Sequence, residues 1–131
     1  MRRLILFAVL TLMGCSRPVS VVGDYTGQLD EPNMKPELNL SIRQQGAQVS
    51  GTGTEVFQLD GPHIANFAFT GQVKGSQVEL RIPDLGGCEV FLRGQVQGTN
   101  IDGEAEFHNP QNAPELPGSI LRTRPFRLHR K

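Results

Sequence analysis

The chain has 131 residues, with 13 basic side chains balanced by 13 acidic ones, and only two cysteines. This charge balance excludes a general nucleic-acid binder, which needs a clear excess of positive charge. The length suffices for one domain with its own hydrophobic core, and two cysteines are too few for a disulfide framework.

The N-terminal segment has the pattern of an export signal. Two arginines at positions 2–3 precede an apolar run over residues 4–12. That run is about half of the ~20 apolar residues that a membrane-spanning helix needs, so the pattern indicates a cleaved signal. The sequence Leu-Met-Gly-Cys at 12–15 resembles the bacterial lipobox, in which the cysteine receives a diacylglycerol and the chain is cut before it. The resemblance implies a signal peptide over 1–14 and palmitate-type acylation of Cys15.

The residues after the cut carry the expected location. By resemblance to lipoprotein sorting in Gram-negative bacteria, Ser16 at the second mature position implies transfer to the outer membrane and a domain that faces the periplasm. Two or more acyl chains give stable attachment, so we expect the membrane to be one partner, bound through Cys15. Residues 15–22 are expected to form a lipidated tether and 23–131 the folded domain. An ordinary cleaved signal without lipid is the alternative.

Beyond residue 22 the apolar residues alternate with polar ones, which predicts an all-β, antiparallel domain. A first strand is expected near Gly23–Leu29 and a last one near Leu121–Arg130. Prolines mark the longer loops at 32–36, 61–62 and 110–117. The alternating residues are Leu38, Leu40 and Ile42; Phe67, Phe69 and Val73; Val78, Leu80 and Ile82; Cys88, Val90, Leu92 and Val96; and Ile101, Ala105 and Phe107.

A repeated turn predicts the pairing of these strands. The sequence of glycine, small residue, amide residue and β-branched residue begins at Gly46, Gly75 and Gly98. If glycine and its successor are the two loop residues, glycine takes the first central position of a type II′ turn, with positive φ. The predicted pairs are Val73 with Val78, Gly71 with Leu80, Phe69 with Ile82, Val96 with Ile101, Gly94 with Gly103, and Leu92 with Ala105.

These hairpins and the two terminal strands give about eight strands. An open sheet of that size would leave exposed edges, so we expect a small up-and-down barrel, with a β-sandwich as the alternative. Glycines inside the strands, including Gly51, Gly53, Gly71, Gly94 and Gly103, favour sharp curvature and closure. They would alternatively leave room for a ligand cavity.

The start of the first strand, Gly23-Asp24-Tyr25, resembles the Gly-x-Trp opening of lipocalin-type barrels, with tyrosine in place of tryptophan. Arg127 or Arg130 in the last strand would correspond to the arginine that closes such barrels. The resemblance implies a calycin-like shape. Proteins of this shape hold small hydrophobic molecules inside the barrel or grip other proteins with their loops.

The sequence shows no arrangement typical of catalysis. His63, His108 and His129 lack the spacing of a metal-binding pair and are expected in loops or at the surface. No nucleophile elbow or phosphate loop is present, and Glu104 and Glu106 are expected on the outer face of one strand. We therefore expect neither enzymatic activity, nor a metal, nor a cofactor. With Cys15 acylated, Cys88 has no partner in the chain and is interpreted as a small buried apolar residue, or alternatively as a reactive thiol or one half of an intermolecular disulfide.

The last ten residues are strongly basic. They carry Arg122, Arg124, Arg127, Arg130 and Lys131, and Phe91 is expected to add an exposed apolar contact beside them. We interpret this set as a candidate docking patch for an anionic surface or an acidic protein. The alternative is an edge strand protected from aggregation by its charges.

Together these features predict an outer-membrane lipoprotein that acts as a non-catalytic binding module. Its expected partner is an envelope protein, and one hypothesis is an assembly or pilot factor for an envelope complex. The alternative is a carrier or sensor of a small apolar ligand inside a lipocalin-like barrel. A continuous cavity larger than about 300 Å³ would favour the carrier, whereas a filled core would favour surface recognition.

Overall fold

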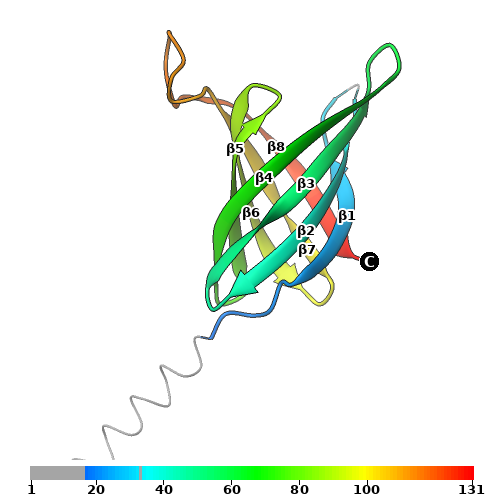
Figure 1. The fold of residues 1–131 in the computed structure, drawn as a ribbon, viewed down its shortest axis with the longest axis vertical. Helices are drawn as coiled ribbons and strands as arrows, with labels where there is room; N and C mark the ends of the chain where they lie inside the picture. Colours follow the sequence, from blue (N-terminus) through cyan, green and yellow to red (C-terminus); the bar gives the residue numbers. More distant parts are fainter. Residues whose placement is uncertain (1–16, 33) are drawn as a thin grey trace, which may run out of the picture.

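The computed structural model describes residues 17–32 and 34–131, which fold as eight antiparallel strands closed into one barrel (Figure 1). Each strand pairs with its neighbour in sequence, and the last pairs with the first. This architecture confirms the predicted up-and-down barrel and excludes the sandwich. The strands are β1 (Gly23–Leu29), β2 (Glu37–Gln45), β3 (Gln48–Gln58), β4 (Pro62–Lys74), β5 (Gln77–Leu85), β6 (Cys88–Gln97), β7 (Asn100–His108) and β8 (Ile120–Arg130).

The predicted register of the hairpins agrees with the structure at five of six pairs. The three pairs of the β6–β7 hairpin and two in the β4–β5 hairpin are present as expected. The sixth, Phe69 with Ile82, lies one step beyond Thr70 and Arg81, where the β4–β5 ladder ends. The pairing stops there because β4 continues along β3, while β5 shifts register against β6 after Ile82.

The three glycine turns have the predicted backbone. Gly46, Gly75 and Gly98 have φ values of 62°, 61° and 60°, and none of the residues that follow them has positive φ. One positive φ, at the first loop position, is the pattern of a type II′ turn. These tight turns fix the register of the strands on either side, so that the core residues of a hairpin point to one face.

The barrel interior is filled by side chains along most of its length. Large apolar residues from every strand are buried there, among them Tyr25, Leu80, Leu92 and Leu128. A Cβ at Gly53 would lie 2.6 Å from Cζ of Phe67. This glycine therefore makes room for an aromatic ring of the core. It does not leave an empty space, which agrees with the curvature interpretation and not with the cavity alternative.

The two ends of the barrel differ. One end, the base, carries the tight turns at 46–47, 75–76 and 98–99, and the chain enters the barrel there from residue 17 (Figure 1). The segment before β1 is bound to this end: the Val19 amide donates to the Gly75 carbonyl, and the Val21 side chain is completely buried. The base is therefore closed by the chain's own N-terminal side.

The other end, the mouth, carries the connections at 30–36, 59–61, 86–87 and 109–119, of which the first and the last are the longest (Figure 1). The wall of the barrel is open on one side of the mouth. Between β4 and β5 only residues 70–74 and 77–81 are paired, so the half of β4 nearest the mouth is paired with β3 alone. In the same region Figure 1 shows β4 and β5 diverging.

The described part of the chain contains no helix that is long and apolar enough to cross a membrane. The lipobox and Cys15 lie outside the described residues.

Candidate functional site

The mouth contains a cavity of about 300 Å³, lined by the β1–β2 connection and by the mouth ends of β1 and of β3 to β8. Its apolar lining includes Leu29, Phe57, Ala65, Leu85 and Phe107. Cys88 also lines it, half-buried, packed against the core and with a free thiol. The cavity therefore has an apolar floor that continues into the barrel core.

A cluster of charged groups lies above this floor. The Arg122 Nε donates to Glu31 Oε1 at 2.7 Å, and the Arg122 Cζ lies 3.9 Å from the centre of the Phe107 ring. Arg124 approaches the same carboxylate, with its Nε 3.8 Å from Glu31 Oε2. The Glu31 side chain is only 13% exposed, so both arginines stabilise a carboxylate that is nearly buried.

Glu55 lines the same cavity from β3 and has a different environment. It has no hydrogen bond or ion pair with any residue within 17–32 and 34–131. Burial raises the pKa of the Glu55 carboxyl, the Glu31 carboxylate raises it further, and Arg122 lowers it. The mouth therefore holds one carboxyl that is paired with arginines and one that is not.

Exposed apolar side chains gather around the mouth. Leu59 and Ile64 lie on the β3–β4 hairpin, and Leu116, Ile120 and Leu121 lie on the β7–β8 connection or at the start of β8. These two connections are on opposite sides of the barrel, because β3–β4 and β7–β8 are half a circuit apart (Figure 1). We call these five residues the apolar rim.

Leu116 is the most exposed residue of the rim, at 74%, and its backbone is strained, with φ of 50°. A left-handed conformation is unfavourable for a bulky residue. Here it is held by side chains of the same loop: the Asn109 Nδ2 donates to the Leu116 carbonyl at 3.2 Å, and the Ser119 Oγ donates to that carbonyl at 2.8 Å. The loop thus fixes an exposed leucine at its tip.

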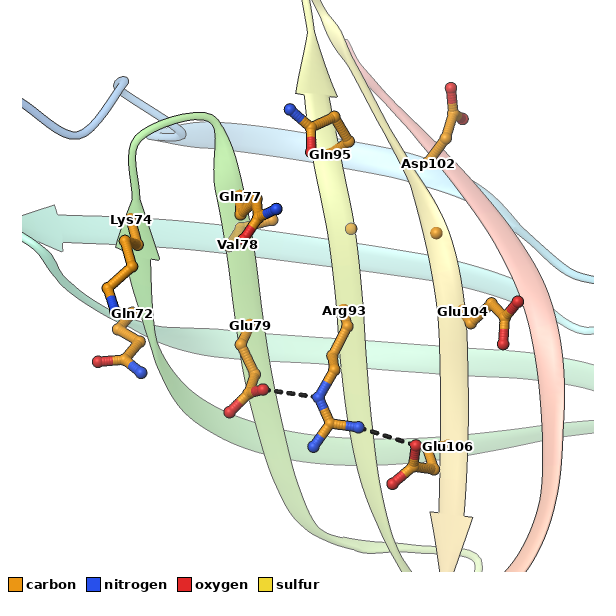
Figure 2. Close-up of a pocket in the computed structure, with 12 residues that line it drawn as sticks. Gln72, Lys74, Gln77, Val78, Glu79, Arg93, Gln95, Asp102, Glu104 and Glu106 are labelled. Carbon is orange, nitrogen blue, oxygen red and sulfur yellow. Dashed lines mark hydrogen bonds and ion pairs between the residues drawn. The ribbon is translucent and has the colours of Figure 1, made fainter. Parts of the chain in front are cut away.

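A second depression, of about 600 Å³, lies on the outer wall across β4, β5, β6 and β7 (Figure 2). Its lining is mostly polar. Figure 2 shows Arg93 between Glu79 and Glu106, and Arg93 bonds these carboxylates at 2.7 and 2.8 Å. The pKa of Glu106 is lowered by its bonds to Arg93 and His108. This open groove has its central charges already paired.

His108 ties the long β7–β8 connection to this network. Its Nδ1 lies 2.9 Å from the Gly118 carbonyl and its Nε2 lies 2.6 Å from Glu106 Oε1. The bond to Gly118, followed by that to Glu106, raises the pKa of His108, although burial opposes the shift. Phe91 packs edge-on against His108, with ring centres 5.0 Å apart. The predicted apolar contact at Phe91 is thus partly covered.

The structure does not bring the predicted basic docking residues into one patch. Arg122 lines the mouth cavity and Arg124 lies beside it, near Glu31. Arg127 lies on the outer wall, bonded to Asp102 at 2.9 Å. Arg130 lies near the base, where Lys131 follows it and donates its amide to the Asp24 carbonyl. Strand alternation and the length of β8 cause this separation.

The protective-edge interpretation of the same strand is wrong. β8 pairs with β7 on one side and β1 on the other, so it has no free edge to protect. Its arginines are instead spread along the barrel, with Arg122 and Arg124 at the mouth, Arg127 on the outer wall and Arg130 at the base. Whether any of them binds a partner stays a prediction.

The arginine expected to close the barrel is Arg130. Its guanidinium bonds the Tyr25 hydroxyl and lies over the Tyr25 ring, with Cζ 5.4 Å from the ring centre. Arg127 has no such contact. The Tyr25–Arg130 pair is consistent with the resemblance of the first strand to lipocalin-type barrels.

Sequence reasoning missed Glu31, Glu55 and Leu116. Glu55 shares one face of its strand with Gly51 and Gly53, which are predicted to face the barrel interior, and this is a signal that its side chain points inward. Arg122 and Arg124 likewise share the parity of the buried Phe126 and Leu128. No comparable signal marks Glu31 or Leu116, because both lie in loops.

Within the described parts of the chain, no group of three or more histidine, cysteine, aspartate or glutamate side chains is arranged to hold a metal ion. The chain matches no protein-family model and no curated protein. The fold alone defines its class: a small, closed, eight-stranded antiparallel barrel, consistent with a calycin-like shape.

Proposed function

We propose that this protein is a lipoprotein of the outer membrane, attached through Cys15 and facing the periplasm, whose barrel binds an envelope protein without catalysing a reaction. In this proposal the mouth and its apolar rim form the binding surface. A role as an assembly or pilot factor for an envelope complex fits such a module.

The observation that carries the proposal is that the loop holds Leu116 exposed at its tip in a strained conformation. An exposed leucine in a left-handed conformation costs free energy, and two side chains of its own loop hold it there. Strained positions of this kind concentrate at sites of recognition. An exposed leucine at a loop tip also offers a partner apolar surface whose burial on binding is favourable.

The orientation of the barrel supports the same surface. The chain enters at the base, so a tether attached to a membrane would leave the mouth pointing away from the lipid (Figure 1). The apolar rim lies on two opposite sides of that free end. A protein partner in the periplasm would meet the rim first.

The open edge of β4 is a further feature suited to a protein partner. The Val73 amide donates toward the β2–β3 turn, and backbone groups alternate in direction along an antiparallel strand. The amides and carbonyls of Ile64, Asn66 and Ala68 therefore point away from β3, on the side where β5 is not paired. An extended segment of a partner would pair there by strand addition.

The test is substitution of the rim with a matched control. Leu116→Asp and Ile64→Asp place charges at the proposed interface, and Gln72→Asp places one on the outer wall near the base. Chemical cross-linking in intact cells should yield an envelope adduct with wild type and Gln72→Asp, and little or none with the two rim variants. The same adduct from all four proteins would contradict the proposed surface.

A second candidate function is carriage of a small apolar ligand, because the mouth cavity has an apolar floor. Its volume of about 300 Å³ is at the lower limit for small-molecule pockets, and the barrel below it is filled. A ligand would therefore occupy the mouth only. Saturable quenching of a fluorescent fatty acid by the protein, competed by unlabelled fatty acid and weakened by Ala65→Phe, would favour the carrier.

A further inference from the structure

Glu55 is a half-buried carboxyl group without a partner of opposite charge at hydrogen-bonding distance. No ion pair or hydrogen bond reaches it from residues 17–32 or 34–131. The groups that act on it are the Glu31 carboxylate, from the β1–β2 connection, and Arg122, from β8. A cation supplied by a binding partner would stabilise the ionised form of this half-buried carboxyl.

The same cavity offers less to an anion. Arg122, which lines the cavity, is bonded to Glu31 and stacked over Phe107. Arg124 Nε lies 3.8 Å from the other oxygen of Glu31 and is buried without a hydrogen-bond partner among the described residues, but Arg124 does not line the cavity. An incoming anion would have to displace Glu31, which is 13% exposed, and leave it without its partners. Leaving a nearly buried carboxylate unpaired is costly, so the charges favour a cation.

The size and lining of the cavity limit what carries the cation. About 300 Å³ accommodates one long side chain but not a large apolar molecule. Ala65, Leu85 and Cys88 line it with small or apolar surface, which suits the aliphatic stem of a lysine or arginine. The apolar rim lies on two opposite sides of the mouth, where the residues that flank such a side chain would pack.

From this geometry we infer that the mouth receives a lysine or arginine side chain of the protein partner, with its charged group at Glu55 and its aliphatic stem against Ala65, Leu85 and Cys88. The inference rests on the proposed function, since it assigns the recognised chemistry to a partner protein. Glu55 would be the residue that selects for positive charge, and the Glu31–Arg122–Arg124 cluster would hold the cavity open around it.

The first experiment uses n-butylamine, which reproduces the lysine side chain beyond Cα. We would titrate it into the full-length, isotope-labelled chain in detergent micelles and follow the amide signals of Glu55, Ala65 and Cys88 by NMR. Saturable shifts at these residues are expected, with much smaller shifts from n-butanol, which lacks the charge. Equal responses to the amine and the alcohol, or shifts centred on other residues, would overturn the inference.

Glu55→Gln tests the role of the carboxylate, and Glu104→Gln, on the exposed outer face of β7, is the matched control. Loss of a charge-assisted bond should weaken butylamine binding by about tenfold or more in Glu55→Gln and leave Glu104→Gln unchanged. Unweakened binding by a folded Glu55→Gln would contradict the assignment. The wild type gives an independent readout, because saturating amine should lower the pKa of the Glu55 carboxyl measured by its ¹³C shift. An unmoved pKa would count equally against the inference.

Cross-linking separates this inference from the function on which it rests. If butylamine fails to bind while the Leu116-dependent adduct persists, the cation site is wrong and the binding module stands. If the amine binds but Glu55→Gln forms the adduct as wild type does, a partner's basic side chain does not occupy the mouth. Loss of the adduct in both Glu55→Gln and Leu116→Asp, with Glu104→Gln unaffected, is the expected result.

Discussion

Arg130 and Tyr25 join the last strand to the first across 105 residues of chain. The Arg130 Nη2 and Nε donate to the Tyr25 hydroxyl at 2.9 and 3.2 Å. The two residues are also direct partners in the β1–β8 ladder. Arg130 Nη2 further approaches the Ser20 carbonyl at 3.3 Å. The Arg130 side chain thus contacts both β1, whose pairing with β8 closes the barrel, and the segment before β1 that leads to the proposed lipid anchor.

Removal of the tyrosine hydroxyl should therefore destabilise the barrel at its seam. Tyr25→Phe removes the hydroxyl that accepts two hydrogen bonds from the partly buried Arg130 and leaves it only the longer contact with the Ser20 carbonyl. We expect the free energy of unfolding to fall by about 1–3 kcal/mol. Arg127→Ala removes an exposed ion pair on the same strand and should cost no more than about 1 kcal/mol. Urea denaturation of both variants measures the difference. Similar midpoints would show that the Tyr25–Arg130 contact adds nothing to closure.

The turn at Gly75 gives a second stability prediction. With φ of 61°, this position penalises β-branched residues, so Gly75→Val should destabilise by more than about 1 kcal/mol. Gly75→Asn should be milder, because asparagine tolerates the left-handed region. No neighbour lies within 4 Å of a Cβ built at Gly75, so the comparison isolates backbone strain from steric clash. Equal urea midpoints for the two variants would refute the turn assignment.

Hydrogen exchange should reveal the open edge of β4. The amides of Ile64, Asn66 and Ala68 point to the side where β5 is not paired, whereas those of Ala65 and Phe67 point toward β3. We expect the first three to exchange rapidly and the last two to be protected. The alternation within one strand is its own control. Uniform protection from 64 to 68 would mean that the edge is covered.

His108 predicts a pH dependence of the β7–β8 connection. Its pKa is raised in the folded protein, so the stabilisation that it contributes is complete below the ordinary histidine pKa of about 6.5 and is lost as pH rises through the higher folded value. As the stabilisation is lost, the hydrogen-exchange rates of the amides in the β7–β8 connection should rise more steeply with pH than the intrinsic exchange rate does. His108→Gln should remove the excess, and an identical excess in that variant would assign it to another group.

The lipid anchor is tested by Cys15→Ser. The variant should lose labelling by radioactive palmitate and leave the outer-membrane fraction, because the acyl chains supply the attachment. Ser16→Asp should retain the protein at the inner membrane if the sorting resemblance holds. Palmitate labelling that persists in Cys15→Ser would rule out this residue as the lipid site.

The parts of the fold that the sequence predicts well are those set by short-range rules. Period-two alternation places Leu80 and Leu92 inside, and the glycine turns at 75 and 98 fix which residues face each other. Pro83 illustrates the limit. The alternation breaks beside it, where β5 shifts register against β6, and the pair expected between Phe69 and Ile82 does not form.

The candidate site depends instead on contacts between distant segments. Glu31 meets Arg122 across 91 residues, and no local pattern indicates that pairing. Arg122 lies four residues before the buried Phe126 on the same strand, so strand alternation predicts that its side chain points inward. The role of an inward arginine, however, depends on the residue that it pairs with, which alternation does not indicate. Leu116 owes its conformation to hydrogen bonds within an irregular loop, which periodicity does not describe.

The central claim is that the mouth binds a protein while the base of the barrel faces the membrane anchor. Site-specific photocross-linking in living cells tests it most directly. A photoreactive amino acid at Leu116 should give a discrete adduct with one envelope protein, and the same amino acid at Gln72, on the outer wall toward the base, should not. The Leu116 adduct should disappear when Glu55 is replaced by glutamine. An adduct from Gln72 with none from Leu116 would contradict the account.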